Sequence, residues 1–170
     1  SVNGMVYMRG KPSDYQKWVE ETGDERWSWE SLLGSYKKLE NNQRLSGIFH
    51  GSEGTIKVSD PSYVAKGSDL YIKSMQNLGL PYNRDFNDGE QYGVGLMQYT
   101  IGDGKRSDTV STLMKPLVNN KNLLIKLNTV VTKIIIENRK ATGVEVISKK
   151  KVDKYYGKEI ILTAGSLVSP

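Results

Sequence analysis

The chain has 170 residues, enough for one domain with its own core or for adjoining parts of two domains. Hydrophobic residues make up 37% and charged residues 25%, a balance that excludes disordered and fibrous proteins. Because there is no cysteine and only one histidine, His50, the segment has no disulfide, no cysteine-bound zinc, no thiol nucleophile and no multi-histidine metal site.

The formal net charge of +5 would suit an anionic partner such as nucleic acid, an anionic surface or a pyrophosphate. The only dense basic cluster, from Lys149 to Lys154, lies between two strand-like runs, where we expect a solvated hairpin turn. We therefore expect no nucleic-acid partner. No apolar run approaches the roughly 20 residues of a membrane-spanning helix, so no transmembrane segment is expected.

Two helices are predicted near the start of the chain. Residues 14–21 carry apolar side chains at helical spacing and are followed by Gly23, a typical helix end. Ser28 is a good N-cap for the second helix, in which apolar side chains recur at three- and four-residue steps over residues 29–39.

Two further helices are predicted before the composition changes. Residues 62–78 carry a helical pattern that stops at Gly79. Ser107 is predicted to cap a fourth helix, which would reach Asn119 with a kink or an early end at Pro116.

Extended segments are predicted on both sides of these helices. Polar and apolar side chains alternate over residues 55–58, which predicts a strand. Residues 92–99 are expected to contain another strand, between a loop and a turn. After Asn122 the pattern is β-branched, which predicts a compact β unit with strands at residues 123–127, 130–137, 142–147 and 159–162. Helices followed by strands suggest α+β pieces attached to one side of a larger sheet.

No complete catalytic constellation is visible in the sequence. His50 lies between Phe49 and Gly51 in a predicted loop, so we expect it to make structural hydrogen bonds rather than to catalyse. The pair Gly93 and Gly95 lacks the third glycine of a dinucleotide fingerprint.

Two segments have the composition of backbone that approaches a ligand closely. Small residues at 163–166 follow a predicted strand, as is typical where a nucleotide meets the carboxyl end of a sheet. Residues 1–6 place an amide side chain and a glycine within an apolar run, which suits either a flat ligand or a simple tight turn.

Several short motifs then resemble one enzyme family in the order in which that family carries them. Residues 1–10 resemble the downstream half of the first sequence signature of the glucose-methanol-choline (GMC) oxidoreductases, in the choline-dehydrogenase-like branch. Residues 163–170 resemble the first half of the second signature. Between them, segments resemble the helix, loop, turn and hairpin of the family, at residues 27–40, 50–54, 104–107 and 141–145.

The resemblance implies a fold and an activity. The expected fold is an α+β fragment of an FAD-binding Rossmann-like (α/β) domain with part of the substrate or cap region. Residues 1–170 would form part of the N-terminal, FAD-binding domain, with a mainly helical and loop segment at 1–121 and a β unit with the return strand at 122–165. The implied cofactor is FAD, and the implied reaction oxidises the CH–OH group of choline or another primary alcohol by hydride transfer to flavin N5.

The resemblance also implies which residues contact the cofactor. Asn3, Gly4, Met5 and Val6 match the stretch that lies against the flavin, and Val131 matches the valine whose backbone meets the adenine. Ala164 and Gly165 match the strand end beside the ADP portion. A covalent flavin linkage is not expected, because no histidine stands in the opening segment.

No catalytic residue and no metal ligand is expected within this chain. In the family that this chain resembles, the loop that binds the pyrophosphate would lie upstream of this chain. The histidine that acts as general base would lie downstream of it. The chain opens on Ser1 rather than Met, and residues 165–170 look like the capped beginning of a helix. We therefore expect an internal fragment of a longer enzyme that is inactive by itself.

The expected partner is a small-molecule alcohol, while the electron acceptor, the substrate's identity and the compartment stay open. Three alternatives remain. The chain could be a non-catalytic remnant or binding module on the same fold, a lyase on that fold, or a basic nucleic-acid-binding domain supported by its charge alone. A pair of histidines downstream would separate the first from the enzyme.

Overall fold

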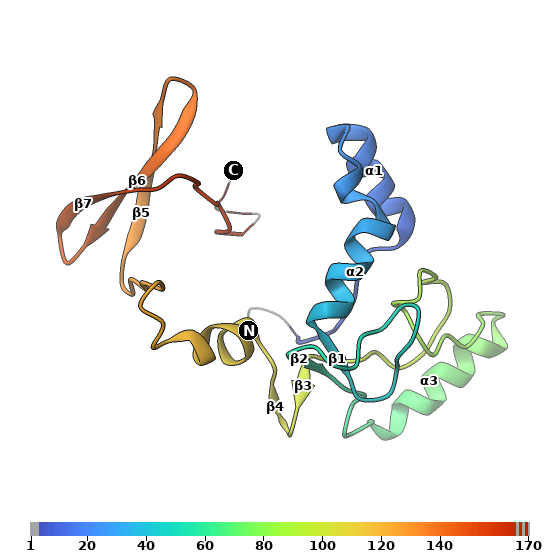
Figure 1. Cartoon of the computed structure of the whole chain (residues 1–170). Coiled ribbons are helices and arrows are strands. Elements are labelled where there is room, and N and C mark those ends of the chain that lie inside the picture. Colours follow the sequence, from blue (N-terminus) through green and yellow to red (C-terminus); the bar gives the residue numbers. More distant parts are fainter. Residues whose placement is uncertain (1–3, 166, 168, 170) are drawn as a thin grey trace. The chain divides into compact units, whose positions relative to one another are not determined.

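The structure is a computed structural model and describes residues 4–165, 167 and 169. The chain divides into two compact units, Ser1–Asn119 and Asn120–Pro170, which are described in turn (Figure 1). The first unit holds the helices and two small sheets, and the second holds a three-stranded sheet. This mixture of helix and strand agrees with the predicted α+β fragment. Among the residues described, no helix is both long and apolar enough to span a membrane.

The first helix, α1 (Pro12–Thr22), is confirmed with its predicted end. The Asp14 carboxylate accepts from the Lys11 backbone N–H at 3.0 Å and so satisfies one of the amides left open at a helix start. Gly23 ends the helix in the left-handed conformation at φ 66°, a region that glycine enters without strain.

The second helix, α2 (Trp29–Leu39), is also confirmed with its predicted cap. Ser28 Oγ accepts from the backbone N–H of Ser31 at 3.3 Å. A short 3-10 turn, η1 (Glu25–Trp27), joins α1 to α2, and Tyr15 of α1 packs on Trp29 of α2 with ring centroids 5.5 Å apart.

A small parallel sheet follows α2 without a break. Strand β1 (Glu40–Asn42) pairs in parallel with β2 (Ile56–Val58), as predicted for residues 55–58, and Val58 is fully buried. The connecting loop packs its glycines directly on the end of α2. A Cβ at Gly51 would lie 1.9 Å from the Lys37 carbonyl oxygen, so no larger residue fits there without moving the backbone.

The third helix, α3 (Lys66–Asn77), begins later than predicted. Ser62 makes no capping hydrogen bond, and Ala65 is extended at ψ 143°, so residues 62–65 lead into the helix without belonging to it. The predicted stop is confirmed, because Gly79 takes a left-handed φ of 96°.

The predicted strand over residues 92–99 was wrong. Tyr99 makes isolated bridges to Val6 and Ser59, and Val94 makes one to Tyr82. The segment therefore pairs with several partners at single positions and forms a continuous strand with none of them. The strands of this region are β3 (Ile101–Gly102) and β4 (Lys105–Arg106), which form a short antiparallel hairpin.

The fourth helix also differs from its prediction. Asp108 caps it by accepting from the Ser111 N–H at 2.7 Å, while Ser107 Oγ accepts from the Lys57 N–H at 2.8 Å in the neighbouring strand. The helix is a π turn, η2 (Val110–Met114), followed by a 3-10 turn, η3 (Lys115–Leu117). Pro116 has no N–H to donate in a regular α-helical hydrogen bond. This explains why the hydrogen bonds of the helix are of the π and 3-10 types and why the helix ends before Asn119.

The second unit is an antiparallel sheet in the order β5 (Val130–Glu137), β6 (Lys140–Ser148) and β7 (Lys151–Tyr156). Two-residue turns join the strands, at Asn138 and Arg139 with φ 51° and 63°, and at Lys149 and Lys150 with φ 49° and 66°. Turns with two left-handed residues match the natural twist of a hairpin. The strands predicted over residues 130–137 and 142–147 are confirmed.

Strands β6 and β7 correct the interpretation of the basic cluster. The solvated turn contains only Lys149 and Lys150, whereas Lys151 and Lys154 belong to β7, which was not predicted. Strands predicted over residues 123–127 and 159–162 are absent from the described residues, because neither segment finds a neighbouring strand to pair with there.

In the second unit, rows of side chains that lie opposite one another across the strands define the two faces of the sheet. Ile134, Val144 and Tyr155 lie opposite one another across the three strands, on the same face as the buried Val146. On the other face Lys133, Glu145 and Lys154 lie opposite one another. Val131, opposite Val146, lies on the face of Val144, whereas Ile147 and Val152 lie on the face of Glu145.

The close packing of Gly51 makes a first prediction. Gly51→Ala should lower the free energy of unfolding by about 1–3 kcal/mol, because the new methyl group collides with a backbone carbonyl. Gly34→Ala is the matched control, since no atom lies within 4 Å of its Cβ position in α2, and it should add about 0.5–1 kcal/mol. Urea unfolding of the complete encoded protein measures both. Equal effects of the two substitutions would contradict the packing described.

Candidate functional site

The opening segment is held along one edge by residues 98–100. The Tyr7 N–H donates to the Gln98 carbonyl at 2.8 Å, and the Thr100 N–H donates to the Met5 carbonyl at 2.8 Å. These two bonds bracket the antiparallel bridge between Val6 and Tyr99. In such a pair the N–H and C=O groups of Val6 point away from the neighbouring segment.

On the side away from residues 98–100, Val6 is partly exposed. Val6 has 46% of its surface exposed, and a Cβ at Gly4 would meet only Val6 Cγ2, at 4.0 Å. Met5 adopts a left-handed φ of 64°, which costs a non-glycine residue about 1–2 kcal/mol and is typical of functional segments. The segment therefore presents a fixed main-chain edge that a flat ligand could approach.

The predicted cofactor contacts divide between the two units. Gly4, Met5 and Val6 are consecutive in the first unit, while Asn3 lies outside the described residues. Val131 lies on the outer strand β5 of the second unit and is 54% exposed. Gly165 has φ 90°, and no atom of the described residues lies within 4 Å of its Cβ position; its carbonyl accepts from the Ser169 N–H at 2.9 Å.

A cluster of buried charges, which sequence reasoning did not find, includes Arg9, which belongs to the opening segment, residues 4–10. Its members are linked by hydrogen bonds into a closed circuit that we call the charge ring: Arg9, Glu40, His50, Asp85 and Asn87. Four of them are at most 5% exposed as residues, namely Arg9, Glu40, His50 and Asn87.

Arg9 enters the ring through its guanidinium group. Its Nη2 forms a salt bridge with Glu40 and donates to the Tyr7 hydroxyl at 3.0 Å, and its Nη1 donates to the Phe49 carbonyl at 2.6 Å. The guanidinium carbon also lies 5.2 Å from the centre of the Tyr36 ring. Its Nε has no partner among the described residues.

Glu40 is the acceptor at the centre of the ring. Besides Arg9, it receives hydrogen bonds from Asn42 Nδ2 at 2.9 Å, from His50 Nδ1 at 2.8 Å and from the Gly51 N–H at 3.1 Å. Burial would raise the pKa of Glu40, but these bonds and the Arg9 charge outweigh it and lower the pKa below its ordinary value. The carboxylate is therefore ionised at neutral pH.

His50 connects Glu40 to Asp85. Its Nδ1 lies 2.8 Å from Glu40 Oε1 and its Nε2 lies 2.9 Å from Asp85 Oδ2. Ionised carboxylates only accept hydrogen bonds, so both ring nitrogens must carry a proton and the side chain is an imidazolium. Burial would lower the pKa of His50, but the two carboxylates raise it to about 9.

The raised pKa of His50 has a defined consequence for stability. Because the pKa in the folded state exceeds the ordinary value of 6.5, the stabilisation is complete below about pH 6.5 and is lost as the pH rises through about 9. The pKa of Asp85 is shifted in the opposite direction: burial would raise it, but the hydrogen bond from His50 lowers it below its ordinary value. The stabilisation from ionised Asp85 is therefore present at neutral pH and is lost as the pH falls into the acid range.

The ring closes on the main chain of the opening segment. Asp85 Oδ1 accepts from the Asn87 N–H at 2.9 Å, which orients the Asn87 side chain. Asn87 Oδ1 then accepts from the Arg9 N–H at 2.7 Å, and its Nδ2 donates to the Tyr7 carbonyl at 3.0 Å. The side chain of Asn87 thus fixes the backbone on both sides of Met8.

A second route runs from the ring to the same segment. Asn42 Nδ2 donates to Gln98 Oε1 at 2.7 Å, and Gln98 Nε2 donates to Asp60 Oδ1 at 2.9 Å. The Gln98 carbonyl is the acceptor of the Tyr7 N–H. The buried amide of Gln98 therefore joins β1 to the strand-like contact that orients Val6.

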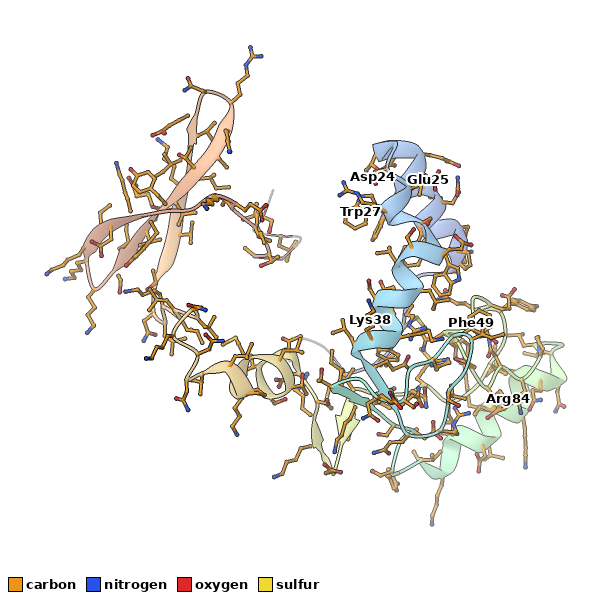
Figure 2. The ribbon with its side chains drawn as sticks, viewed as in Figure 1. Asp24, Glu25, Trp27, Lys38, Phe49 and Arg84 are labelled. Carbon is orange, nitrogen blue, oxygen red and sulfur yellow. The ribbon has the colours of Figure 1, made fainter. Side chains whose placement is uncertain are left out.

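Two hollows border His50. One, of about 670 Å³, lies between the loop that carries Phe49 and the segment after α3 that carries Arg84, both labelled in Figure 2. The other, of about 490 Å³, includes Lys38 at the end of α2. Among the described residues, no group of acidic, cysteine or histidine side chains is arranged to hold a metal ion.

Comparison with known proteins assigns the family. The sequence matches the GMC oxidoreductase family over residues 1–170. The chain belongs to the GMC oxidoreductases. Members of this family bind FAD, and the recognised sequence signatures at the two ends of the chain agree with this assignment.

Named relatives cover the whole chain. An alcohol dehydrogenase (acceptor) of Pseudomonas putida is 35% identical, over 100% of this chain and 31% of its own length. The mitochondrial choline dehydrogenase of Mus musculus is 30% identical, over 100% of this chain and 28% of its own length. The crystal structure of pyridoxine 4-oxidase from Mesorbium loti superposes with a TM-score of 0.88 at 31% identity, over 96% of this chain and 32% of that chain. The sequence thus spans about a third of these proteins.

The buried pair of Arg9 and Glu40 makes a second prediction. Arg9→Met should lower the free energy of unfolding by about 3–5 kcal/mol, because it leaves the Glu40 carboxylate buried without its cation. Arg26→Met is the matched control: its salt bridge with Asp24 has the arginine side chain 89% exposed, and its loss should change stability little. Unfolding by urea, followed by circular dichroism, compares the two. A small effect at Arg9 would show that the pair is solvated.

Proposed function

We propose that the complete protein is an FAD-dependent oxidoreductase that acts on the CH–OH group of a small-molecule alcohol, and that this chain supplies part of its flavin site. The observation that carries the proposal is the orientation of the Val6 main chain, whose N–H and C=O point away from Tyr99, in a chain that belongs to the GMC family throughout. Backbone N–H and C=O groups held in place suit the polar edge of a flat, heteroaromatic cofactor.

The residues of the second unit suit the nucleotide part of the cofactor. Val131 offers half-exposed apolar surface on the outer strand β5, where an adenine ring could pack. Ala164 has only a methyl side chain and Gly165 has none, so that the ADP portion could approach their backbone. When bound, FAD would accept the hydride of the alcohol at N5.

The described residues contain no accessible histidine for proton removal. His50 is the only histidine, its side chain is 3% exposed, and both ring nitrogens are engaged by carboxylates. An alcohol must lose a proton as its hydride leaves, so the proposed function needs a base from outside the charge ring.

The substrate class follows from the relatives. They include an alcohol dehydrogenase and a choline dehydrogenase at 35% and 30% identity, which favours choline or another primary alcohol. A pyridoxine 4-oxidase with the same chain fold acts on an aromatic compound, so the screen should include both types. Because dehydrogenases and oxidases occur together among the relatives, oxygen and an artificial electron acceptor should be compared.

Anaerobic reduction of the flavin tests the proposed function. The purified complete protein should show visible flavin absorbance that bleaches on addition of choline, an aliphatic alcohol, an aromatic alcohol or pyridoxine, since hydride transfer reduces the ring. A protein that binds FAD but is reduced by none of them, while dithionite reduces it, would be a binding module. A protein that binds no FAD would refute the proposal.

Exposed valines of the second unit provide a third prediction. Val131→Glu should weaken FAD binding about tenfold, because it places a charged carboxylate where the apolar face of the adenine ring is expected. Val152→Glu is the matched control, since Val152 is 58% exposed on the opposite face of the same sheet. Titration of the apoprotein with FAD, followed by quenching of flavin fluorescence, measures both. Equal affinities would remove Val131 from the adenine site.

A further inference from the structure

We propose that His50 is a positioning residue for the flavin site, which acts through Asp85 and Asn87 on the main chain that follows Val6. The inference rests on the proposed function, because it assumes that the outward-facing N–H and C=O groups of Val6 contact FAD. His50 itself is buried and touches neither those groups nor the predicted cofactor contacts in the described residues.

The connection is made of consecutive short hydrogen bonds. His50 fixes one oxygen of Asp85 at 2.9 Å, and the other oxygen of Asp85 fixes the Asn87 N–H at 2.9 Å. Asn87 holds Tyr7 and Arg9 through both atoms of its amide. Tyr7 directly follows Val6, whose outward-facing N–H and C=O form the proposed contact edge, so a displacement of Asn87 would move that edge.

The connection depends on the charge of His50. With an imidazolium, the ring contains two cations, Arg9 and His50, and two anions, Glu40 and Asp85, and every facing oxygen has a donor. A neutral imidazole has a single N–H, so one carboxylate would face a lone pair. That arrangement leaves a buried net negative charge, which favours opening of the loop that carries Asp85.

The charged groups around His50 allow this change to be assigned to it. Glu40 from β1 and Asp85 from the loop after α3 touch its ring. Arg9 neutralises Glu40, and Arg44 lies near Asp85. Other charged side chains border the two hollows beside it: Lys37, Lys38, Glu53, Arg84, Asp88 and Glu90. His50 is the group whose pKa is raised to about 9, so its proton is lost in mildly alkaline solution.

The experiment measures the dissociation constant of FAD against pH for the complete protein and two variants. For the wild type, binding should be constant near neutral pH and weaken about tenfold as the pH rises from 7.5 to 10. Asp85→Asn should bind as the wild type does at pH 7.5 but keep its affinity in alkali. An asparagine can donate to neutral His50 through Nδ2 and still accept from the Asn87 N–H through Oδ1.

His50→Gln should bind FAD about tenfold more weakly at every pH, because both N–H donors of a glutamine are on one nitrogen and its Oε1 would face one of the two carboxylates. Circular dichroism at each pH shows that the compared proteins are folded, and the visible flavin spectrum reports the environment of the bound ring. If His50→Gln does not fold, Asp85→Asn alone decides, because it preserves the connection and removes the need for charge.

The outcomes separate this inference from the proposed function. A wild type that binds no FAD at any pH refutes the proposed function. A wild type that binds FAD, with Asp85→Asn losing affinity in alkali just as the wild type does, overturns the role of His50 and leaves the proposed function standing. Lower melting temperatures for folded variants with unchanged FAD affinity and spectrum would likewise show that the ring stabilises the fold only.

Discussion

At the centre of the first unit, the carboxylate of Glu40 is fully buried and accepts hydrogen bonds from Arg9, Asn42, His50 and Gly51. A carboxylate removed from water is costly unless donors fill its lone pairs. The donors come from the opening segment, from β1 and from the loop before β2. Meeting the needs of this one group therefore fixes three separate pieces of chain relative to one another.

A buried ionic cluster of this kind is not an efficient source of stability, because well-packed apolar side chains often do as well. The cluster instead fixes the position of the backbone around it. Asn87 and Gln98 convert the cluster into hydrogen bonds on the backbone of Tyr7 and Arg9, and the bridge to Tyr99 turns the polar groups of Val6 outward. The buried hydrogen bonds thus hold the backbone of Val6 in one orientation, as a preorganised binding site requires.

Much of the local structure follows from the sequence because its causes lie within a few residues. Ser28 and Gly23 bound helices as capping chemistry predicts. The β-branched runs form β5 and β6 because each pairs with its neighbour across a two-residue turn. Strand β7 was predicted to be part of a turn because of its lysines, so this error also came from the composition of a few neighbouring residues. The family signatures are likewise short and contiguous.

The sequence by itself therefore determined the capped helices, the central hairpin and the family. Only the tertiary structure decided which polar residues meet. Arg9 and Glu40 are 31 positions apart and His50 and Asp85 are 35 apart, and no periodicity marks any of them. Ser107, an apparent helix cap, instead bonds a strand 50 positions earlier. Such contacts are chosen by burial and the need to pair every buried charge, which is a property of the folded chain.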